Sequence, residues 1–505
     1  MKNKLFIIVL FLTLIFTILP YIYATSTTGG GYVFGGFLLN PLDGNSYLAK
    51  MRLGWDGAWK FTLPYTANPG EGGYLFLFYI LLGHIARWLN LSLIFTFHLA
   101  RAAASVFLTV SMYVFCLRTF PENRTWAERC FLWVCLGSGM GWLLFTFGII
   151  TTDLWVPEAY PFLSEYVNPH FPLGLSLLLW IFIWSGQNDT KSRIYIFLAA
   201  ACLAVIQPFA IVICAAVLVV LTAWRWFEQK RLEGLNLLAL LAGGGPFLAY
   251  QFWITTSDPV LAGWNSQNQT PSPALWDLIL SFSPAILFAG LALFRFRSWR
   301  PNYYQKVAAS WFVCCLVLIL FPFSLQRRFL TGFYVPVVIL AVIGVTLLVS
   351  SLKIQRRVFT LLFSLSVPTI LVVLALAVFG ISGHDKSLYL QVGEQKAFVW
   401  VSESTPLNSI ILASPDTGNL IPAYTGRRVL YGHPFETVNA EIQKAQVTDL
   451  FNGSISTTAA IMILHELNIE YVFYGPRERL LGSPAFIQQL KPVFQGPEVV
   501  IYTVK

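Results

Sequence analysis

Residues 4–23 read KLFIIVLFLTLIFTILPYIY, and this stretch decides the class of fold. An α-helix needs ~20 apolar residues to cross the hydrocarbon core of a bilayer, and the stretch supplies them with Lys4 as its one charge. A cleaved signal peptide has a shorter apolar core, so we expect an uncleaved first membrane helix. Comparable apolar stretches recur along the chain up to residue 382.

Charged residues are scarce throughout the chain. Of 505 residues, 56% are hydrophobic and 11% are charged, whereas soluble domains are about 25% charged. The net charge of +9 comes from lysines and arginines that cluster in short loops, as the positive-inside rule requires. No basic stripe interleaved with aromatic residues indicates a nucleic-acid partner. The chain is therefore predicted to be a polytopic α-helical membrane protein with about eleven spans.

The apolar stretches give the positions of these spans. We expect two short helices that meet at Gln207-Pro208 within residues 194–224, because proline removes a backbone donor. Residues 74–92 either span the membrane or lie along its surface, and the charge pattern favours the surface. The predicted single spans are residues 4–23, 94–117, 130–150, 169–185, 232–254, 274–294, 307–323, 329–351 and 358–382.

The basic residues also predict the topology. Lys2 and Lys4 place the N-terminus in the cytoplasm. The following loops alternate, so residues 383–505 are expected on the exoplasmic side of a plasma (inner) membrane protein. Some bases depart from this pattern, which favours a role other than orientation, although a few outer bases are also normal. They are Lys50, Arg52, Lys60, Arg327 and Arg328.

Residues 383–505 are predicted to form a separate α/β domain, which follows a membrane-embedded catalytic module over residues 1–382. Short apolar runs predict strands, and the segments between them predict helices. Glu403, His433 and Glu436 are interpreted as surface residues of this tail. The predicted strands lie in residues 409–414, 428–431 and 470–475, and the predicted helices are residues 435–452 and 457–468.

Asp43 lies in a polar, glycine-rich segment, residues 29–73, directly after the first apolar stretch. A carboxylate just outside the bilayer can take the proton of an acceptor hydroxyl, which makes Asp43 the predicted general base. The competing interpretation is a simple turn, because Asp and Gly are favoured turn residues and Gly44 follows.

Two further outer segments carry polar groups. Glu158 and Glu165 are predicted catalytic acids that orient the acceptor, and the alternative is that they are solvated loop acids. Arg327 or Arg328 is predicted to hold a lipid phosphate, since guanidinium binds phosphate bidentately, and the alternative is a helix end anchored at headgroups. The other predicted substrate-binding residues are Tyr47, Lys50, Arg52, Asn168 and His170.

No cofactor is predicted. His170 has no second histidine at metal-ligand spacing, so no zinc site is expected, and a need for a divalent metal is left open. Asn168-Pro169 is equally consistent with a simple helix start, because proline is favoured in the first turn.

The chain resembles the GT-C superfamily of polytopic glycosyltransferases, and most closely bacterial proteins grouped with protein-mannosyltransferases and aminoarabinose transferases. The similar stretches begin at Leu42-Asp43, Val167-Asn168 and Tyr424-Thr425, the last including Tyr431-Gly-His433-Pro. The resemblance implies a polyprenyl-phosphate sugar donor, with Asp43 as the catalytic acid of the first loop. Mannosyltransferases carry an Asp-Glu pair, whereas Gly44 follows Asp43 here. Asn68-Pro69-Gly70-Glu71 stands in place of their basic-Pro-Pro-Leu motif.

We therefore expect an inverting membrane glycosyltransferase that transfers a sugar from a polyprenyl-phosphate donor to an exoplasmic glycan, lipid or protein acceptor. One alternative is a transporter or flippase of lipid-linked saccharides. Transporters place ionisable residues near the bilayer midplane, but the predicted spans are nearly charge-free. The other alternative is a non-catalytic protein of envelope assembly whose tail binds a partner.

Overall fold

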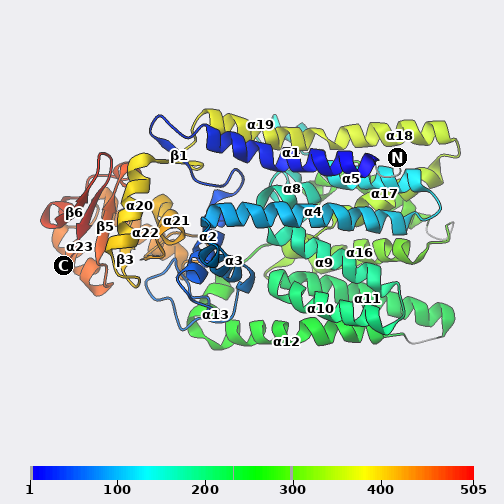
Figure 1. The fold of residues 1–505 in the computed structure, drawn as a ribbon, viewed down its shortest axis with the longest axis horizontal. Helices are drawn as coiled ribbons and strands as arrows, with labels where there is room; N and C mark the ends of the chain where they lie inside the picture. The colour runs from blue at the N-terminus through cyan, green and yellow to red at the C-terminus, as the bar shows by residue number, and fades with distance from the viewer. Residues whose placement is uncertain (1–3, 231–232, 296–298, 505) are drawn as a thin grey trace. The chain divides into compact units, whose positions relative to one another are not determined.

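The computed structural model describes residues 4–230, 233–295 and 299–504, so Lys2 and residue 232 lie outside the described residues. The chain divides into two compact units (Figure 1). The helical unit comprises Met1–Ile22, His98–Ala249 and Thr270–Phe379, and the mixed unit comprises Tyr23–Phe97, Tyr250–Gln269 and Gly380–Lys505.

The helical unit consists of the helices whose bounds follow. Four of them, α1, α4, α12 and α19, also contribute residues to the mixed unit. The helices are α1 (Lys4–Ser26), α4 (Leu93–Thr119), α5 (Arg124–Leu136), α6 (Trp142–Phe145), α7 (Thr152–Trp155), α8 (Pro161–Val167), α9 (His170–Ser185), α10 (Thr190–Ile206), α11 (Pro208–Gln229), α12 (Leu235–Ser257), α14 (Leu275–Ser281), α15 (Ala285–Phe294), α16 (Tyr303–Leu320), the 3₁₀ helix η2 (Gln326–Leu330), α17 (Tyr334–Leu348), α18 (Leu352–Ser366) and α19 (Pro368–Ser382).

The described part of the chain contains six helices that are long and apolar enough to cross a membrane, or seven if α14 and α15 form one bent span. The protein is therefore a multi-pass membrane protein, and the count of about eleven spans stays a prediction. Three shorter apolar helices are Leu77–Trp88, His170–Ser185 and Tyr334–Leu348. The six long helices are Lys4–Ser26, Leu93–Thr119, Pro208–Glu228, Leu235–Ser257, Tyr303–Leu320 and Leu352–Ser382. The last of these comprises α18 and α19.

Two predicted spans are wrong as single straight helices. Within residues 130–150, α5 ends at Leu136, and the glycine-rich segment that follows is not helical, because Gly141 donates its backbone N–H to Asp153 over 2.9 Å. Within residues 274–294, α14 and α15 meet at an angle of 99°. Pro284 lies at that break and lacks a backbone N–H.

The predicted break at Gln207-Pro208 is confirmed, because α10 ends at Ile206 and α11 begins at Pro208. Neither helix is short, however: they have 17 and 22 residues. In the region 74–92 the structure has α3 (Leu77–Trp88), a helix of 12 residues. At 1.5 Å per residue it is about 18 Å long, which is short of the ~30 Å core of a bilayer.

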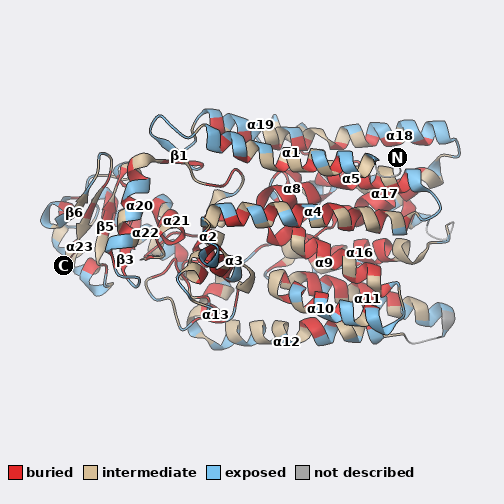
Figure 2. Ribbon diagram, viewed as in Figure 1, coloured by how far each residue is buried: buried red, intermediate tan, exposed pale blue. Residues whose placement is uncertain are grey.

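The centre of the helical unit is α17. Every residue from Tyr334 to Val345 is buried, and α17 packs against α15, α16 and α5 (Figure 2). Gly344 allows the close approach to α15, since a Cβ atom at this position would overlap the carbonyl oxygen of Phe288. An apolar helix that is buried on all sides belongs to the core of a helical assembly.

The mixed unit holds the described strands and the remaining helices. In the five-stranded sheet, β4, β3 and β5 are parallel, and β5, β7 and β6 are antiparallel neighbours (Figure 1). The elements are β1 (Tyr32–Phe34), α2 (Pro41–Trp55), α3, α13 (Pro259–Gln267), β2 (Tyr389–Gln391), α20 (Val392–Ser404), β3 (Ile410–Leu412), α21 (Pro415–Thr425), β4 (Arg428–Val429), α22 (Ala440–Asn452), α23 (Thr457–Glu466), β5 (Tyr471–Tyr474), α24 (Pro476–Arg479), the 3₁₀ helix η3 (Ala485–Gln489), β6 (Lys491–Gln495) and β7 (Val500–Thr503).

The three strands predicted in the tail are confirmed as β3, β4 and β5, whereas β2, β6 and β7 were not predicted. Of the two predicted helices, α23 is confirmed, whereas α22 begins at Ala440 rather than 435. The mixed unit also contains residues 23–97 and 250–269. The domain boundary at residue 382 therefore stays a prediction.

Helix α2 carries Asp43 and packs closely on α3 and α21. Glycines permit the contact with α3: a Cβ atom on Gly54 would overlap the carbonyl oxygen of Ile80, and one on Gly83 would overlap that of Met51. The backbones of α2 and α3 therefore touch at two points.

Candidate functional site

Asp43 lies in the first turn of α2. Asn40 caps the helix, since its side chain accepts a hydrogen bond from the backbone N–H of Asp43, and Pro41 occupies the first helical position. A carboxylate is favoured at a helix N-terminus because it faces the positive end of the helix dipole. The interpretation of Asp43-Gly44 as a simple turn is therefore wrong.

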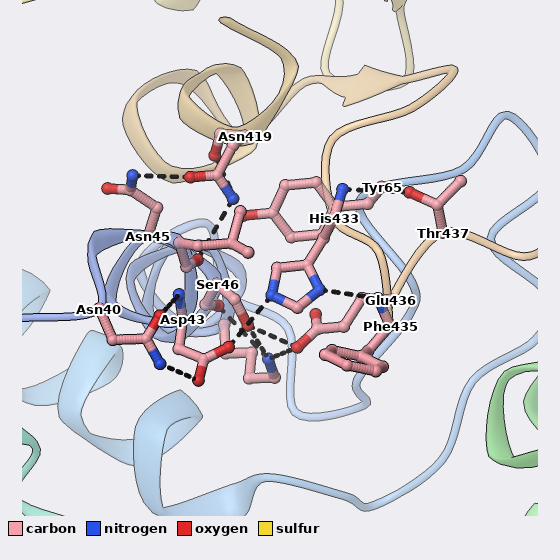
Figure 3. A network of polar contacts seen from close by, with 12 residues as sticks. Asn40, Asp43, Asn45, Ser46, Tyr65, Asn419, His433, Phe435, Glu436 and Thr437 are labelled. Carbon is pink, nitrogen blue, oxygen red and sulfur yellow. Dashed lines mark hydrogen bonds and ion pairs between the residues drawn. The ribbon is translucent and has the colours of Figure 1, made fainter. Parts of the chain in front are cut away.

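Two donors orient the Asp43 carboxylate (Figure 3). One oxygen lies 3.2 Å from Nε2 of His433, and the other accepts a hydrogen bond of 2.5 Å from Nδ2 of Asn40. The side chain of Asp43 is 38% exposed, whereas that of His433 is 2% exposed. The carboxylate is thus held from the protein side and open on another.

The tautomer of His433 follows from its second ring nitrogen. The backbone N–H of Phe435 donates to Nδ1 over 3.2 Å, so the proton of the neutral ring is assigned to Nε2, which donates to Asp43. Thr437 closes the loop, because its Oγ1 accepts from the backbone N–H groups of Gly432 and His433. The interpretation of His433 as a surface residue is wrong.

Glu436 is the second anchor of α2 and is also buried rather than on the surface. Its Oε1 accepts from Nζ of Lys50 at 2.6 Å and from the hydroxyl of Ser46 at 2.5 Å. Burial raises the pKa of the Glu436 carboxyl, but the charge of Lys50, the electrostatic effect of His433 and the hydrogen bonds from Lys50 and Ser46 together outweigh burial and leave that pKa below its ordinary value. Lys50 has no exposed side-chain surface, and its ammonium also lies 4.5 Å from the ring centroid of Phe76.

The spacing of the polar residues along α2 allows one short loop, residues 433–436, to contact all of them. Asp43, Ser46 and Lys50 are separated by three and four residues, so they share one face of the helix. His433 and Glu436 meet this face from the loop that precedes α22.

A neighbouring face of α2 contacts α21. Nδ2 of Asn45 donates to Asn419 over 2.8 Å, and Asn419 donates to the carbonyl oxygen of Leu42 over 3.2 Å. The hydroxyl of Tyr65 donates to the backbone oxygen of Asn419 over 3.2 Å (Figure 3). The start of α2 is therefore held by Asn419 of α21, whose backbone Tyr65 contacts in turn.

Gly44 has a steric reason to follow Asp43. A Cβ atom at this position would overlap the ring of Phe37. The glutamate that mannosyltransferases carry next to the catalytic Asp therefore does not fit here, so the departure from that motif reflects local packing.

The other predicted binding residues of the first outer segment have structural partners. The ring of Tyr47 stacks on that of Tyr79 with centroids 4.4 Å apart. Arg52 forms an ion pair of 3.3 Å with Asp56 at the end of α2. Both side chains lie on the helix that carries Asp43.

In the helical unit, Glu158 is buried beside two arginines. Its Oε1 lies 3.6 Å from Nε of Arg327 and 3.4 Å from Nη1 of Arg328. The guanidinium of Arg327 also lies 4.5 Å from the ring centroid of Trp155. Two guanidinium groups therefore share one buried carboxylate.

Glu165 is fully buried, so the interpretation of Glu158 and Glu165 as solvated loop acids is wrong for both. Thr109 donates to the Glu165 carboxylate over 3.3 Å, and burial raises the pKa of Glu165 well above its ordinary value. Asn168 and His170 are buried at the junction of α8 and α9, where His170 is the first residue of α9. The expected helix start after Asn168-Pro169 is therefore confirmed.

Within the described ranges, no group of three or more His, Cys, Asp or Glu side chains has a geometry that could hold a metal ion. The sequence reading missed His433, Glu436 and Asn419 as partners of α2. The one available signal was the run Tyr431-Gly-His433-Pro, in which glycine and proline flank a histidine.

Comparison with known proteins rests on structure. No family model matches the chain. No curated protein matches it in sequence. An oligosaccharyltransferase of Archaeoglobus fulgidus superposes with a TM-score of 0.57 and 13% identity, over 94% of this chain and 69% of that one.

Two further similar structures come from bacteria. ArnT of Cupriavidus metallidurans, bound to undecaprenyl phosphate, gives a TM-score of 0.52 and 10% identity over 97% of this chain and 98% of that one. The arabinofuranosyltransferase AftD from Mycobacteria gives 0.50 and 14%, over 98% of this chain and 40% of that one. The chain therefore has a GT-C-like fold over nearly its whole length, as the resemblance in sequence implied.

The ion pair between Lys50 and Glu436 yields a stability prediction. Glu436→Gln leaves the Lys50 charge buried without its counter-ion, which is expected to lower the free energy of unfolding by ~3–5 kcal/mol. Asp56→Asn, which breaks a partly exposed pair on the same helix, is expected to cost less than ~1 kcal/mol. Thermal unfolding of the purified protein in detergent measures both.

The same pair predicts a pH dependence. Because the pKa of Glu436 is lower in the folded state than its ordinary 4.5, its contribution is present at neutral pH and is lost as the pH falls through the folded-state value. Glu436→Gln should therefore lose less stability than the wild type on acidification. Equal stability of wild type and Glu436→Gln at neutral pH would contradict the buried pair.

Proposed function

We propose that this protein is a membrane glycosyltransferase that uses a polyprenyl-phosphate-linked sugar as donor and Asp43 as general base. The GT-C-like fold supports this class of activity, since an oligosaccharyltransferase, ArnT and an arabinofuranosyltransferase share it. The observation that carries the proposal is the oriented, partly exposed carboxylate of Asp43, with His433 as its buried donor.

The reaction is a single displacement with inversion at the anomeric carbon. The acceptor hydroxyl oxygen forms the new bond to that carbon while its proton passes to the partly exposed carboxylate of Asp43. The bond from the anomeric carbon to the phosphate oxygen breaks, and the electron pair leaves with the polyprenyl phosphate. His433 donates a hydrogen bond to Oδ1 of Asp43 and thereby orients the carboxylate for proton transfer.

The leaving phosphate requires cations. We assign this role to Arg327 and Arg328, because their side chains are partly exposed and one buried carboxylate, Glu158, holds both. The structures of ArnT with undecaprenyl phosphate and of the archaeal oligosaccharyltransferase with a dolichol-phosphate show ligands of this class in the same fold. Glu158 then positions the arginines, whereas Glu165, which has no exposed surface, remains a prediction from sequence as an acceptor-orienting acid.

The proposal includes the topology. The N-terminus is cytoplasmic, residues 1–382 form the membrane-embedded catalytic module with about eleven spans, and residues 383–505 are exoplasmic. Asp43 and its donor His433 then lie on the exoplasmic side of the plasma (inner) membrane, as does the Lys50–Glu436 pair. The acceptor is correspondingly an exoplasmic glycan, lipid or protein.

Asp43→Asn tests the base. The amide keeps the size of the side chain but cannot accept the proton, so transfer is expected to fall by ~10²–10⁴-fold. The measurement is transfer of labelled sugar from synthetic undecaprenyl-phosphate glycosides to envelope acceptors by protein in nanodiscs. The matched control is Asp56→Asn on the same helix, which should retain transfer. Full activity of folded Asp43→Asn would rule out the proposed base.

Arg328→Lys tests the phosphate site. Lysine keeps the charge and the ion pair with Glu158 but loses the planar fork, so the affinity for undecaprenyl phosphate should fall about tenfold, or ~1.4 kcal/mol. Arg124→Lys, in an exposed pair on α5, is the control and should bind as the wild type does. Native mass spectrometry of the lipid complex reads out both variants. Unchanged lipid affinity in Arg328→Lys would contradict the assignment.

A further inference from the structure

A cavity of about 300 Å³ lies in the mixed unit beside the start of α2. Small-ligand sites have volumes of ~300–1,000 Å³, so this cavity suits a small ligand. Pro41 and Leu42, which directly precede Asp43, and Asn45 form one wall. Its other lining residues come from the segment between β1 and α2, the segment between α19 and β2, β2 itself, and the starts of α21 and α24.

The apolar and polar groups of the lining are of the kinds that bind a sugar. Phe37, Leu388 and Leu420 offer apolar surface for the C–H faces of a sugar ring. Asn45 and Asn419 supply amide groups to the lining, and because both ends of the Asn419 amide bond Asn45 and Leu42, Asn45 Oδ1 is the amide acceptor that a sugar hydroxyl could use.

Asn45 carries an additional signal. It is buried, it lines the cavity, and its Oδ1 accepts no hydrogen bond within the described part of the chain. Buried polar atoms are almost always paired, so an unpaired acceptor at a cavity wall favours a ligand that donates a hydrogen bond.

The charges of the lining nearly balance. Arg477 donates to Glu394 over 2.8 Å, which leaves the exposed Lys386 and the exposed Asp416 as the remaining charges. The first turns of α2 and α21 would favour an anion, but each already contains a carboxylate, Asp43 in α2 and Asp416 in α21. The lining therefore fits an uncharged ligand better than a phosphate.

We propose that this cavity binds an uncharged sugar unit, and that the acceptor of the transfer reaction is consequently a glycan. The second half rests on the proposed function. A sugar in the cavity would contact Pro41 and Leu42, which directly precede Asp43 in α2.

Saturation-transfer NMR on the full-length protein in nanodiscs tests the binding, with methyl glycosides of common hexoses and N-acetylhexosamines as probes. Ser387→Trp fills the mouth of the cavity from an exposed position and should lower the affinity about tenfold or more, or ~1.4 kcal/mol. Ser404→Trp, at an exposed position on α20 outside the lining, is the matched control and should bind normally. Lys386→Ala should also bind normally.

Three results would overturn the site: no glycoside signal in the wild type, an equal signal in Ser387→Trp, or a signal that needs Lys386 and is displaced by inorganic phosphate. Asp43→Asn separates the two proposals, since it should still bind glycosides. Binding without any Asp43-dependent transfer would refute the function and leave the sugar site standing. Transfer with a normal acceptor KM in Ser387→Trp would refute the site and leave the function standing.

Discussion

The buried ion pair between Lys50 and Glu436 is the contact on which the candidate site depends. A fully buried ammonium is tolerated only with a close counter-charge, so the pair joins α2 to the loop before α22 wherever the protein is folded. Ser46 adds a hydrogen bond to the same carboxylate. Asp43 lies on this face of α2, two turns before Lys50, and its position is therefore set by the same contact.

The neighbouring polar groups on α2 have different roles. The Lys50–Glu436 pair is shielded and structural, whereas Asp43 keeps an exposed edge and receives its donors from Asn40 and His433. A carboxylate that is oriented on one side and open on the other has the geometry that a general base needs. The site on Glu158 in the helical unit has the opposite character, because there the carboxylate is buried and the cations are partly exposed.

Local patterns in the sequence predicted much of the fold but few of the contacts of the site. Apolar stretches located α1, α4 and α16, because each needs only its own residues to satisfy a membrane core. The glycine-rich break after Leu136 was missed, since the backbone groups there bind partners such as Asp153 that hydropathy does not reveal.

The candidate site shows the same limit more clearly. Asp43 was identified because it stands in a polar segment after an apolar one. Its partner His433 is 390 residues away in the chain, and Glu436 is 386 residues from Lys50, so no local pattern connects them. The alternative that Glu158 and Glu165 are solvated loop acids arose for a related reason, because their partners Arg328 and Thr109 are also distant in sequence.

The central claim is that His433, with its proton on Nε2, holds the Asp43 carboxylate. The direct measurement is NMR of ¹⁵N-labelled histidine in the reconstituted protein, at a pH where the imidazole is neutral, with the His433 signals assigned by their loss in His433→Gln. The account predicts a protonated Nε2 and an unprotonated, hydrogen-bonded Nδ1, with the Nε2 signal shifted in Asp43→Asn. A proton on Nδ1, or an Nε2 signal that is unchanged in Asp43→Asn, would contradict this assignment of the His433 proton.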